Sequence, residues 1–339
     1  MVSVSIIFVN YKGKEDDIKT CLSSLYKQTF RDFEVIFVDN DSQDDSVEFV
    51  KKKFPKVRII ESKKNLGFAA GNNLGVKYAR GKYVFILNLD TQVDRNCLKE
   101  LVGFIKNNKD VVVSPKILLS NKRNEINTTG MAFHYLGFGW CDNLGKIDND
   151  QFNEMEITFP SGAAFLISKN IYNTLGGFDE NYFMYYEDSD LGWRLRLKDY
   201  KIMLVPKAKI YHKYFFGKHP QKFYFAERNR IVTIMKNYEI KTLVLIFPAF
   251  LLMEIGLLFY SLVSGLFFSK LRSYYWVLKN MDNIFREREV IQRSRKVSDK
   301  EIVKYFFSKI EFREIASPLI DYILNPVLDV YWKIIKRFI

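Results

Sequence analysis

The sequence is poor in cysteine and lacks several common nucleotide and nucleic-acid motifs. Its three cysteines, Cys21, Cys97 and Cys141, are odd in number and share no CxxC spacing, which argues against a disulfide framework or a zinc site and fits a reducing compartment. It has neither a Gly-Lys-Ser/Thr loop nor GxGxxG spacing. No DNA-binding helix pair or metal-finger spacing occurs, so we expect no nucleic-acid partner. Residues 2–9 are too short an apolar stretch for a signal peptide, so we expect the chain to start in the cytosol.

Negative charge is scarce in the C-terminal part. Residues 1–200 hold 27 Lys and Arg against 27 Asp and Glu, whereas residues 201–339 hold 25 against 12, so the whole net charge of +13 lies there. The basic residues flank very apolar stretches, a pattern that favours contact with anionic lipid. A solvated basic face is the alternative.

The first half alternates between buried strands and helices. Apolar, β-branched runs predict strands over residues 4–9, 34–38, 57–60 and 83–87, and helical spacing predicts helices over 16–26, 47–53 and 71–80. The order is β-α-β-α-β-α-β. We therefore expect a doubly wound, Rossmann-like α/β nucleotide-binding domain whose ligand lies beyond the carboxyl ends of the strands.

Polar residues follow these predicted strands. Asp39 can accept hydrogen bonds from a base or a ribose, or can be a helix N-cap. The small-residue segment 65–73 opens a helix whose N-terminus would favour phosphate oxygens. Asn88 and Asp90 end the fourth strand with one residue between them, which suits Mg²⁺ or Mn²⁺, although a turn followed by an N-cap is the alternative.

A second acidic cluster, residues 187–190, follows an aromatic run. Carboxylates at such a place are costly to desolvate, and they usually hold a cation or move a proton. Together the two clusters suggest a metal site and a base.

These segments, in this order, resemble the family 2 glycosyltransferases, which are inverting nucleotide-sugar enzymes of GT-A fold. The resemblance covers roughly residues 3–240 and is closest to a rhamnosyltransferase-like branch. It is carried by residues 4–11, 38–42, 65–72, 87–90, 162–167 and 177–194.

The resemblance implies a donor site that holds a nucleotide and a metal. Asn88 stands where the family has the first Asp of its DxD motif, and Asp90 would ligate the divalent cation, with His212 as a second ligand. The residues implied in nucleotide binding are Asn10, Tyr11, Asp39, Asn40, Ser42, Asn65, Gly67, Phe68, Gly71, Asn72 and Asn88.

The acidic cluster would supply the catalytic base of the inverting displacement. We assign this role to Asp188, with Glu187 and Asp190 as alternatives. Asp190 could instead have a structural role, as the partner of Arg194 one helical turn later. The resemblance also implies acceptor or diphosphate contacts at Gly162, Ala163, Trp193, Arg194 and Arg228.

The C-terminal part is apolar and basic. Residues 243–268 form a run interrupted by Glu254 and Pro248 that is long enough to cross a bilayer as a helix. Because Glu254 would then lie near the bilayer centre, we favour helices lying in the membrane face over a single-pass span. Residues 302–310 predict an amphipathic helix. A helical subdomain packed on the catalytic domain or on a second subunit is the alternative.

The sequence thus predicts a GT-A catalytic domain over residues 1–240, with a donor half about 1–115 and an acceptor half about 116–240, and a helical membrane-associating region over 241–339. We expect a metal-dependent inverting transferase that moves a sugar from a nucleoside-diphosphate sugar to a hydroxyl or phosphate of a lipid-linked glycan at the cytoplasmic membrane face. A sugar nucleotidyltransferase and a membrane-surface scaffold with a decayed site are the rival hypotheses, and a homo-oligomer stays open.

Overall fold

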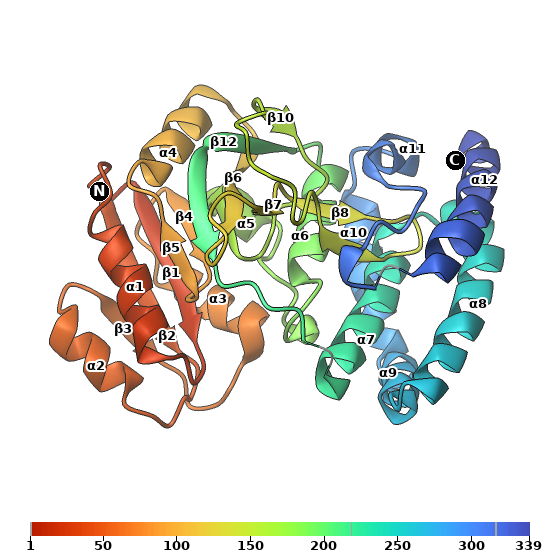
Figure 1. Ribbon diagram of the computed structural model, residues 1–339, viewed down its shortest axis with the longest axis horizontal. Helices are drawn as coiled ribbons and strands as arrows, with labels where there is room; N and C mark the ends of the chain where they lie inside the picture. The colour runs from red at the N-terminus through yellow and green to blue at the C-terminus, as the bar shows by residue number, and fades with distance from the viewer. Residues whose placement is uncertain (1, 218, 316) are drawn as a thin grey trace. The chain divides into compact units, whose positions relative to one another are not determined.

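The chain folds into two compact units, shown in a computed structural model that describes residues 2–217, 219–315 and 317–339 (Figure 1). The first unit takes the described residues of 1–131, 141–191 and 200–214, and the second takes those of 132–140, 192–199 and 215–339. The boundaries predicted near residues 115 and 240 stay predictions. Residues 1, 218 and 316, which fall inside the predicted domains, lie outside the described residues.

The N-terminal half of the first unit is the predicted nucleotide-binding alternation. Four parallel strands lie in the order β4-β1-β2-β3, and three helices connect them. The strands are β1 (Val4–Asn10), β2 (Phe33–Asp39), β3 (Arg58–Glu61) and β4 (Tyr83–Leu87), and the helices are α1 (Glu15–Leu25), α2 (Ser46–Lys53) and α3 (Gly67–Lys77). The α/β doubly wound prediction is confirmed. Helix α3 begins earlier than expected because the small-residue segment is itself the first helical turn.

The rest of this sheet is mixed. Strand β11 (Ala164–Ser168) lies antiparallel between β4 and β6 (Val111–Leu119), and β12 (Lys201–His212) runs parallel to β6. The shorter strands of this sheet are β5 (Thr91–Val93), β7 (Ile126–Thr128) and β10 (Met155–Glu156), whereas β8 (Met131–Phe133) and β9 (Gly139–Cys141) form a separate two-stranded sheet. The helices between these strands are α4 (Cys97–Asn107), α5 (Lys169–Thr174) and α6 (Glu187–Leu197). The first strand of the sheet is buried through apolar side chains that include Val4, Ile6 and Phe8.

Two antiparallel pairings position the candidate site. In the first, Ala164 of β11 lies opposite Leu87 of β4. In the second, His212 at the end of β12 lies opposite Thr91 of β5. Both pairings bring distant parts of the chain beside the turn that follows β4.

The second unit is mainly helical (Figure 1). It contains α7 (Pro220–Asn237), α8 (Ile240–Val263), α9 (Phe267–Lys279), α10 (Met281–Ser294), α11 (Asp299–Ile302) and α12 (Asn325–Ile335). The apolar run 243–268 is therefore not one helix, because the chain turns at Gly265, where φ is +72°. Among the described residues, α8 alone is long and apolar enough to cross a bilayer.

The prediction of an amphipathic helix over residues 302–310 is wrong. Helix α11 ends at Ile302, and a short 3-10 turn follows. The chain is then extended, and the Phe307 N–H donates a hydrogen bond to the Phe133 carbonyl at 2.9 Å. The apolar side chains of this segment, including Ile302, Phe306 and Ile310, are buried rather than arranged along an exposed helix.

Glu254, in the middle of the apolar helix α8, is buried in a charge cluster. Its carboxylate contacts Arg230 of α7 and accepts hydrogen bonds from Lys270 at 2.8 Å and from the Tyr274 hydroxyl at 2.6 Å, both on α9. Glu227 of α7 completes the cluster through Arg230 at 3.0 Å. Burial alone would raise the pKa of Glu254, but Arg230 and Lys270 lower it to about 2. Glu254 thus joins three helices as a carboxylate.

Candidate active site

The turn after β4 carries the residues predicted to bind a metal. The side chain of Asp90 is 41% exposed, and its Oδ1 lies 3.3 Å from His212 Nε2. The pairing of β5 with β12 brings the two side chains together. One further backbone hydrogen bond joins the same segments, from the Lys213 N–H to the Asp90 carbonyl at 3.0 Å. The structure therefore brings together the two predicted ligands, although they lie far apart in the sequence.

These two side chains fit a divalent cation that takes its other ligands from elsewhere. A carboxylate oxygen is the donor that Mg²⁺ and Mn²⁺ prefer, and a neutral imidazole can supply one nitrogen. The described residues hold no group of three or more His, Cys, Asp and Glu side chains suited to a metal ion. A cation bound here would complete its coordination with water or with phosphate oxygens.

The acidic cluster opens helix α6. Asp188 Oδ2 accepts a hydrogen bond from the Gly162 N–H at 2.8 Å, and its Oδ1 accepts one from the Ser189 N–H at 2.6 Å. Burial nevertheless raises the pKa of Asp188 above its ordinary value. For Glu187, burial and the nearby Asp188 charge both raise the pKa. Two adjacent carboxyls with raised pKa values are typical of a proton-transfer site.

The two other acids of the cluster differ in their surroundings. Oε2 of Glu187 is buried and has no hydrogen-bond partner within the described part of the chain. Asp190, by contrast, is fully buried and accepts a hydrogen bond from the Tyr182 hydroxyl at 3.3 Å. This placement suits a structural role for Asp190 better than proton exchange with an acceptor.

Residues 162 and 163 lie between the two acidic segments. The Gly162 N–H bonds Asp188, as described, and the Ala163 carbonyl accepts a hydrogen bond from the Asn88 N–H at 2.8 Å. Adjacent residues of one chain segment thus contact both predicted functional clusters. Both clusters are thus bonded to the two residues that precede β11.

An aromatic segment ties the start of α3 to the acidic cluster. The Phe183 carbonyl accepts hydrogen bonds from the N–H groups of Phe68 at 2.6 Å and Ala69 at 3.2 Å. Phe183, Tyr185 and Tyr186 all have positive φ, at 64°, 66° and 70°. Residues other than glycine rarely adopt this conformation, so surrounding contacts must hold it. The sequence does not predict this role for Phe183, because no residue pattern predicts an aromatic residue with positive φ.

The residues predicted to bind the nucleoside form a buried polar network after β1 and β2. Asn10 Nδ2 donates to Asp39 Oδ1 at 3.0 Å and to the Ser42 hydroxyl at 2.8 Å. Asn40 Nδ2 donates to Asn65 Oδ1 at 3.0 Å and to the Gly67 carbonyl at 3.0 Å. The network fixes both loops, and it connects the second strand to the loop before α3.

The remaining predicted nucleotide contacts differ in exposure. Tyr11 is 49% exposed beside this network. Gly71 allows α3 to approach β1, because a Cβ there would lie 2.9 Å from a methyl group of Val9. Asn72 is buried and donates to the Phe68 carbonyl at 2.9 Å.

Three predicted contact residues belong to the second unit. Trp193 is fully buried and packs edge-to-face on Phe133, with ring centroids 5.4 Å apart. Arg194 is also buried. Arg228 on α7 lies over the Trp276 ring, 4.2 Å from its centroid, and its Nε donates to Asn229 at 2.7 Å.

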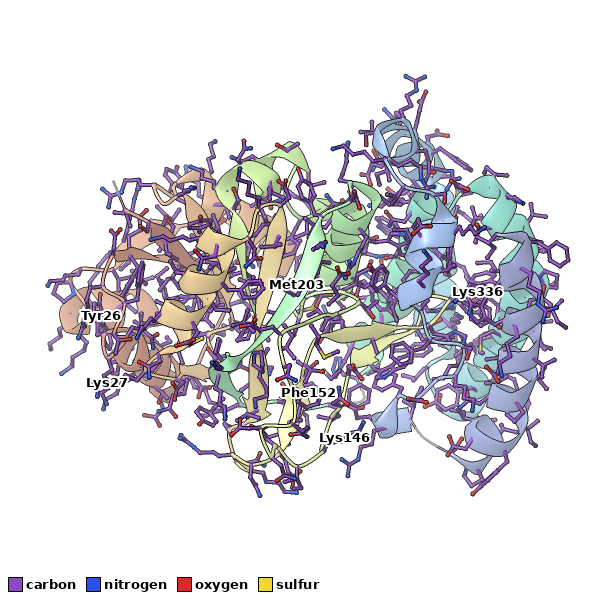
Figure 2. All side chains as sticks on the ribbon, turned by 90° about the horizontal axis from the view of Figure 1, so that it is seen from above. Tyr26, Lys27, Lys146, Phe152, Met203 and Lys336 are labelled. Carbon is purple, nitrogen blue, oxygen red and sulfur yellow. The ribbon has the colours of Figure 1, made fainter. Side chains whose placement is uncertain are left out.

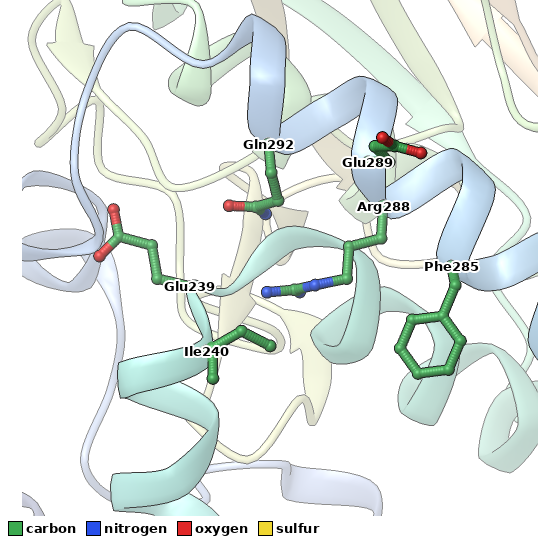
Figure 3. A pocket seen from close by; sticks show the side chains of 6 residues that line it. All are labelled: Glu239, Ile240, Phe285, Arg288, Glu289 and Gln292. Atoms are coloured by element: carbon green, nitrogen blue, oxygen red, sulfur yellow. The ribbon is translucent and has the colours of Figure 1, made fainter.

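The second unit also has a surface pocket of 340 Å³ that the sequence did not predict (Figure 3). Arg288 lines it but uses its guanidinium to cap the end of α7, since Nη1 donates to the Tyr238 carbonyl at 2.6 Å. The other lining residues are Glu239, Ile240, Phe285, Glu289 and Gln292. None of the residues predicted for the site lines this pocket.

Comparisons with known proteins identify a family and several relatives of this chain. The model of the family described as glycosyl transferase family 2 matches residues 3–176. A low-salt glycan biosynthesis hexosyltransferase, Agl10, of Haloferax volcanii is 27% identical over 59% of this chain and 63% of its own. An N-acetylglucosaminyl-diphospho-decaprenol L-rhamnosyltransferase of Mycobacterium tuberculosis is 26% identical over 56% of this chain and 70% of its own. The match thus spans less than two thirds of the first relative.

Solved structures share the fold. The crystal structure of GalNAc-T7 with UDP, GalNAc and Mn²⁺ aligns with a TM-score of 0.58 and 16% identity, covering 69% of this chain and 48% of that chain. The crystal structure of S. aureus TarS aligns with a TM-score of 0.52 and 22% identity, covering 74% of this chain and 43% of that chain. At these identities the likeness concerns the fold alone.

Proposed function

The chain belongs to glycosyl transferase family 2, and we propose that it moves a sugar, with inversion, from a nucleoside-diphosphate sugar to a hydroxyl or phosphate of a lipid-linked glycan. One observation carries this proposal. Residues 162 and 163 are hydrogen-bonded to Asp188 and to Asn88, which supports a single site bordered by the proposed base and the proposed cation-binding turn. An inverting displacement needs these two functions on either side of the anomeric carbon.

The proton-transfer role falls to Asp188. An acceptor hydroxyl must lose its proton as its oxygen attacks, and a carboxylate within hydrogen-bond distance can take that proton. Burial raises the pKa of Asp188 towards the operating pH, and a general base is most effective when its pKa lies near that pH. The Gly162 N–H orients the carboxylate through Oδ2.

The donor side is formed by the Asn10 and Asn40 networks and by the turn after β4. Asp39 and Tyr11 would hold the nucleoside, and Asp90 with His212 would hold Mg²⁺ or Mn²⁺. Such a cation supplies electrostatic stabilisation of the charge that develops on the departing diphosphate. The structural neighbour solved with UDP and Mn²⁺ is consistent with a divalent cation.

The second unit supports a membrane location. Its helices α8 and α12 expose large apolar side chains, among them Val244, Phe247, Phe259, Val330 and Ile334. Basic side chains accompany them, including the exposed Lys241, Lys333 and Lys336, the last labelled in Figure 2. Apolar surface combined with positive charge suits an anionic bilayer. We propose peripheral, monotopic attachment to the cytoplasmic face.

A lipid-linked acceptor agrees with this location. The decaprenol rhamnosyltransferase is named for such an acceptor. Attachment through the second unit would hold the enzyme at the surface where a polyprenyl-linked glycan lies, and it would raise the local concentration of that acceptor.

A panel of nucleotide sugars tests the proposed function. The donor should raise the melting temperature of the full chain in the presence of Mn²⁺, because a ligand that binds the native state stabilises it. The same donor should be hydrolysed slowly without acceptor, and Asp90→Ala should abolish that hydrolysis. Release of diphosphate from a nucleoside triphosphate and a sugar phosphate would instead identify a nucleotidyltransferase.

A further inference from the structure

His212 is held through both of its ring nitrogens. Its Nε2 faces Asp90, at 3.3 Å, and its Nδ1 lies 2.8 Å from the side-chain oxygen of Asn127. The imidazole is buried, and the Asn127 side chain is almost completely so. Nothing in the sequence alone gives Asn127 a role.

The arrangement of strands makes this contact a fixed feature. Asn127 is the middle residue of β7, which pairs with β6 through Ile126 and Leu118. His212 of β12 pairs with the next residue of β6, Leu119. The shared neighbour β6 therefore sets the distance between the two side chains.

The Asn127 atom that faces Nδ1 influences which ring nitrogen carries the proton. An amide oxygen only accepts hydrogen bonds, so the contact with Nδ1 is a hydrogen bond only when Nδ1 carries the proton, and in a neutral imidazole this leaves Nε2 unprotonated. Nε2 then keeps its lone pair and points it at the Asp90 carboxylate. An unprotonated Nε2 and a carboxylate oxygen at this distance both offer lone pairs, so a divalent cation could be bound by both atoms.

The other end of the amide is consistent with this orientation. Asn127 Nδ2 lies 3.9 Å from the sulfur of Cys141, which can accept a weak hydrogen bond. A flipped amide would instead present its NH₂ group to Nδ1. A neutral imidazole would then carry its proton on Nε2, where it could donate to Asp90, and Nε2 would have no lone pair for a metal.

We propose that Asn127 is a positioning residue that fixes the Nδ1–H tautomer of His212 and so reserves Nε2 for a divalent cation shared with Asp90. This inference rests on the proposed function, and it adds a residue outside the segments that carry the family resemblance. Partners that orient a ligating histidine in this way typically contribute 10-fold to 100-fold to metal affinity.

The tautomer can be observed directly by ¹⁵N NMR of metal-free protein labelled at histidine. The chain has only three histidines, so His212→Gln identifies the His212 signals. At a pH at which the imidazole is neutral, we expect the wild-type protein to carry a proton on Nδ1 and none on Nε2. Asn127→Asp, which keeps an accepting oxygen, should preserve this pattern, whereas Asn127→Leu should not.

Mn²⁺ affinity of the full chain, measured by electron paramagnetic resonance, provides the second readout. Asn127→Leu should weaken Mn²⁺ binding by about 10-fold to 100-fold relative to the wild type, whereas Asn127→Asp should keep the wild-type affinity. Asn124→Leu is the matched control, because this exposed asparagine lies three residues away in the same hairpin. Its Mn²⁺ affinity should equal that of the wild type.

The outcomes separate this inference from the function on which it rests. A wild-type protein that binds Mn²⁺ but carries its proton on Nε2 overturns the role of Asn127 alone, as does unchanged affinity in a folded Asn127→Leu variant. A wild-type protein that shows a bare Nε2 and binds no Mn²⁺ contradicts the proposed cation, and the inference falls with it.

Discussion

The backbone N–H of Gly162 donates a hydrogen bond to Oδ2 of Asp188 at 2.8 Å. Because the next residue of the same segment bonds the turn that carries Asp90, this contact fixes the proposed base relative to the proposed cation site. A Cβ at position 162 would lie 3.2 Å from the same carboxylate oxygen, so the close approach favours glycine.

Transfer should depend on pH through Asp188. This carboxyl must be ionised to accept a proton, so kcat/KM should fall as the pH drops through the pKa of Asp188. Burial raises that pKa, and the fall should therefore begin at a higher pH than for an exposed aspartate. A pH profile of kcat/KM measures this. A profile that is flat down to the ordinary aspartate pKa would contradict the assignment.

The contact between α3 and the aromatic segment should matter for both stability and activity. Gly67 has a φ of +75°, and a Cβ there would lie 2.4 Å from the Phe183 carbonyl oxygen. Gly67→Ala should therefore destabilise the protein by more than the cost of about 1–2 kcal/mol of a left-handed alanine, and should lower kcat. Chemical denaturation and initial rates measure the two effects.

Gly176 supplies the matched control for this substitution. Its φ is +78°, but a Cβ there would meet none of the described atoms within 4 Å. Gly176→Ala should show the backbone cost alone, with kcat unchanged. Equal effects of the two substitutions would show that the Phe183 contact has no part in activity.

Substitution of Glu254 tests how α8 is accommodated. Glu254 contacts Arg230 and Lys270 inside the second unit, so Glu254→Leu would leave two buried cations with one carboxylate fewer. Removing one member of a buried ion pair typically costs about 3–5 kcal/mol. We expect a corresponding loss of stability in denaturant unfolding. For a helix that crosses lipid alone, the same substitution would be stabilising, which is the contradicting result.

The same carboxylate makes stability depend on pH. The pKa of Glu254 is lowered from 4.5 to about 2 in the folded protein, so its stabilising contribution is present above about pH 4.5 and is lost as the pH falls towards 2. Glu254→Gln should flatten this part of the stability profile. An identical acid profile in the variant would argue against the buried cluster.

Membrane attachment should depend on the exposed apolar side chains of α8. Phe259 is 67% exposed, and burying a phenylalanine in an apolar phase is worth about 1.5–3 kcal/mol. Phe259→Asp should therefore weaken binding to vesicles that contain anionic lipid by roughly tenfold or more. Met155→Asp, at an exposed apolar side chain of the first unit, is the control. Equal binding of both variants in vesicle sedimentation would place the attachment elsewhere.

The sequence was sufficient to predict the local part of this architecture. Strands such as β1 and β4 are continuous apolar runs, and the polar residues at their ends follow the rule that parallel strands present their carboxyl ends together. The sequence also predicted the two acidic clusters. These features depend on residues that are neighbours in the sequence, so the sequence alone predicts them.

The non-local part required the structure. His212 reaches Asp90 because β12 pairs with β5, and a pairing between such distant segments leaves no local pattern. The same holds for the buried partners of Glu254, which lie on two other helices. The helix predicted over residues 302–310 failed for a related reason, since tertiary contacts of Phe307 override its helical spacing.

The most direct measurement of the central claim compares Asp188→Asn with Asp90→Ala in one assay of donor binding and transfer. Asp188→Asn should keep the Mn²⁺-dependent stabilisation by the donor and lose transfer by about 10²-fold to 10⁴-fold. Asp90→Ala should lose both, and Glu180→Gln, at an exposed acid of the first unit, should lose neither. Equal loss of donor binding and transfer in Asp188→Asn, or transfer at the wild-type rate, would contradict the account.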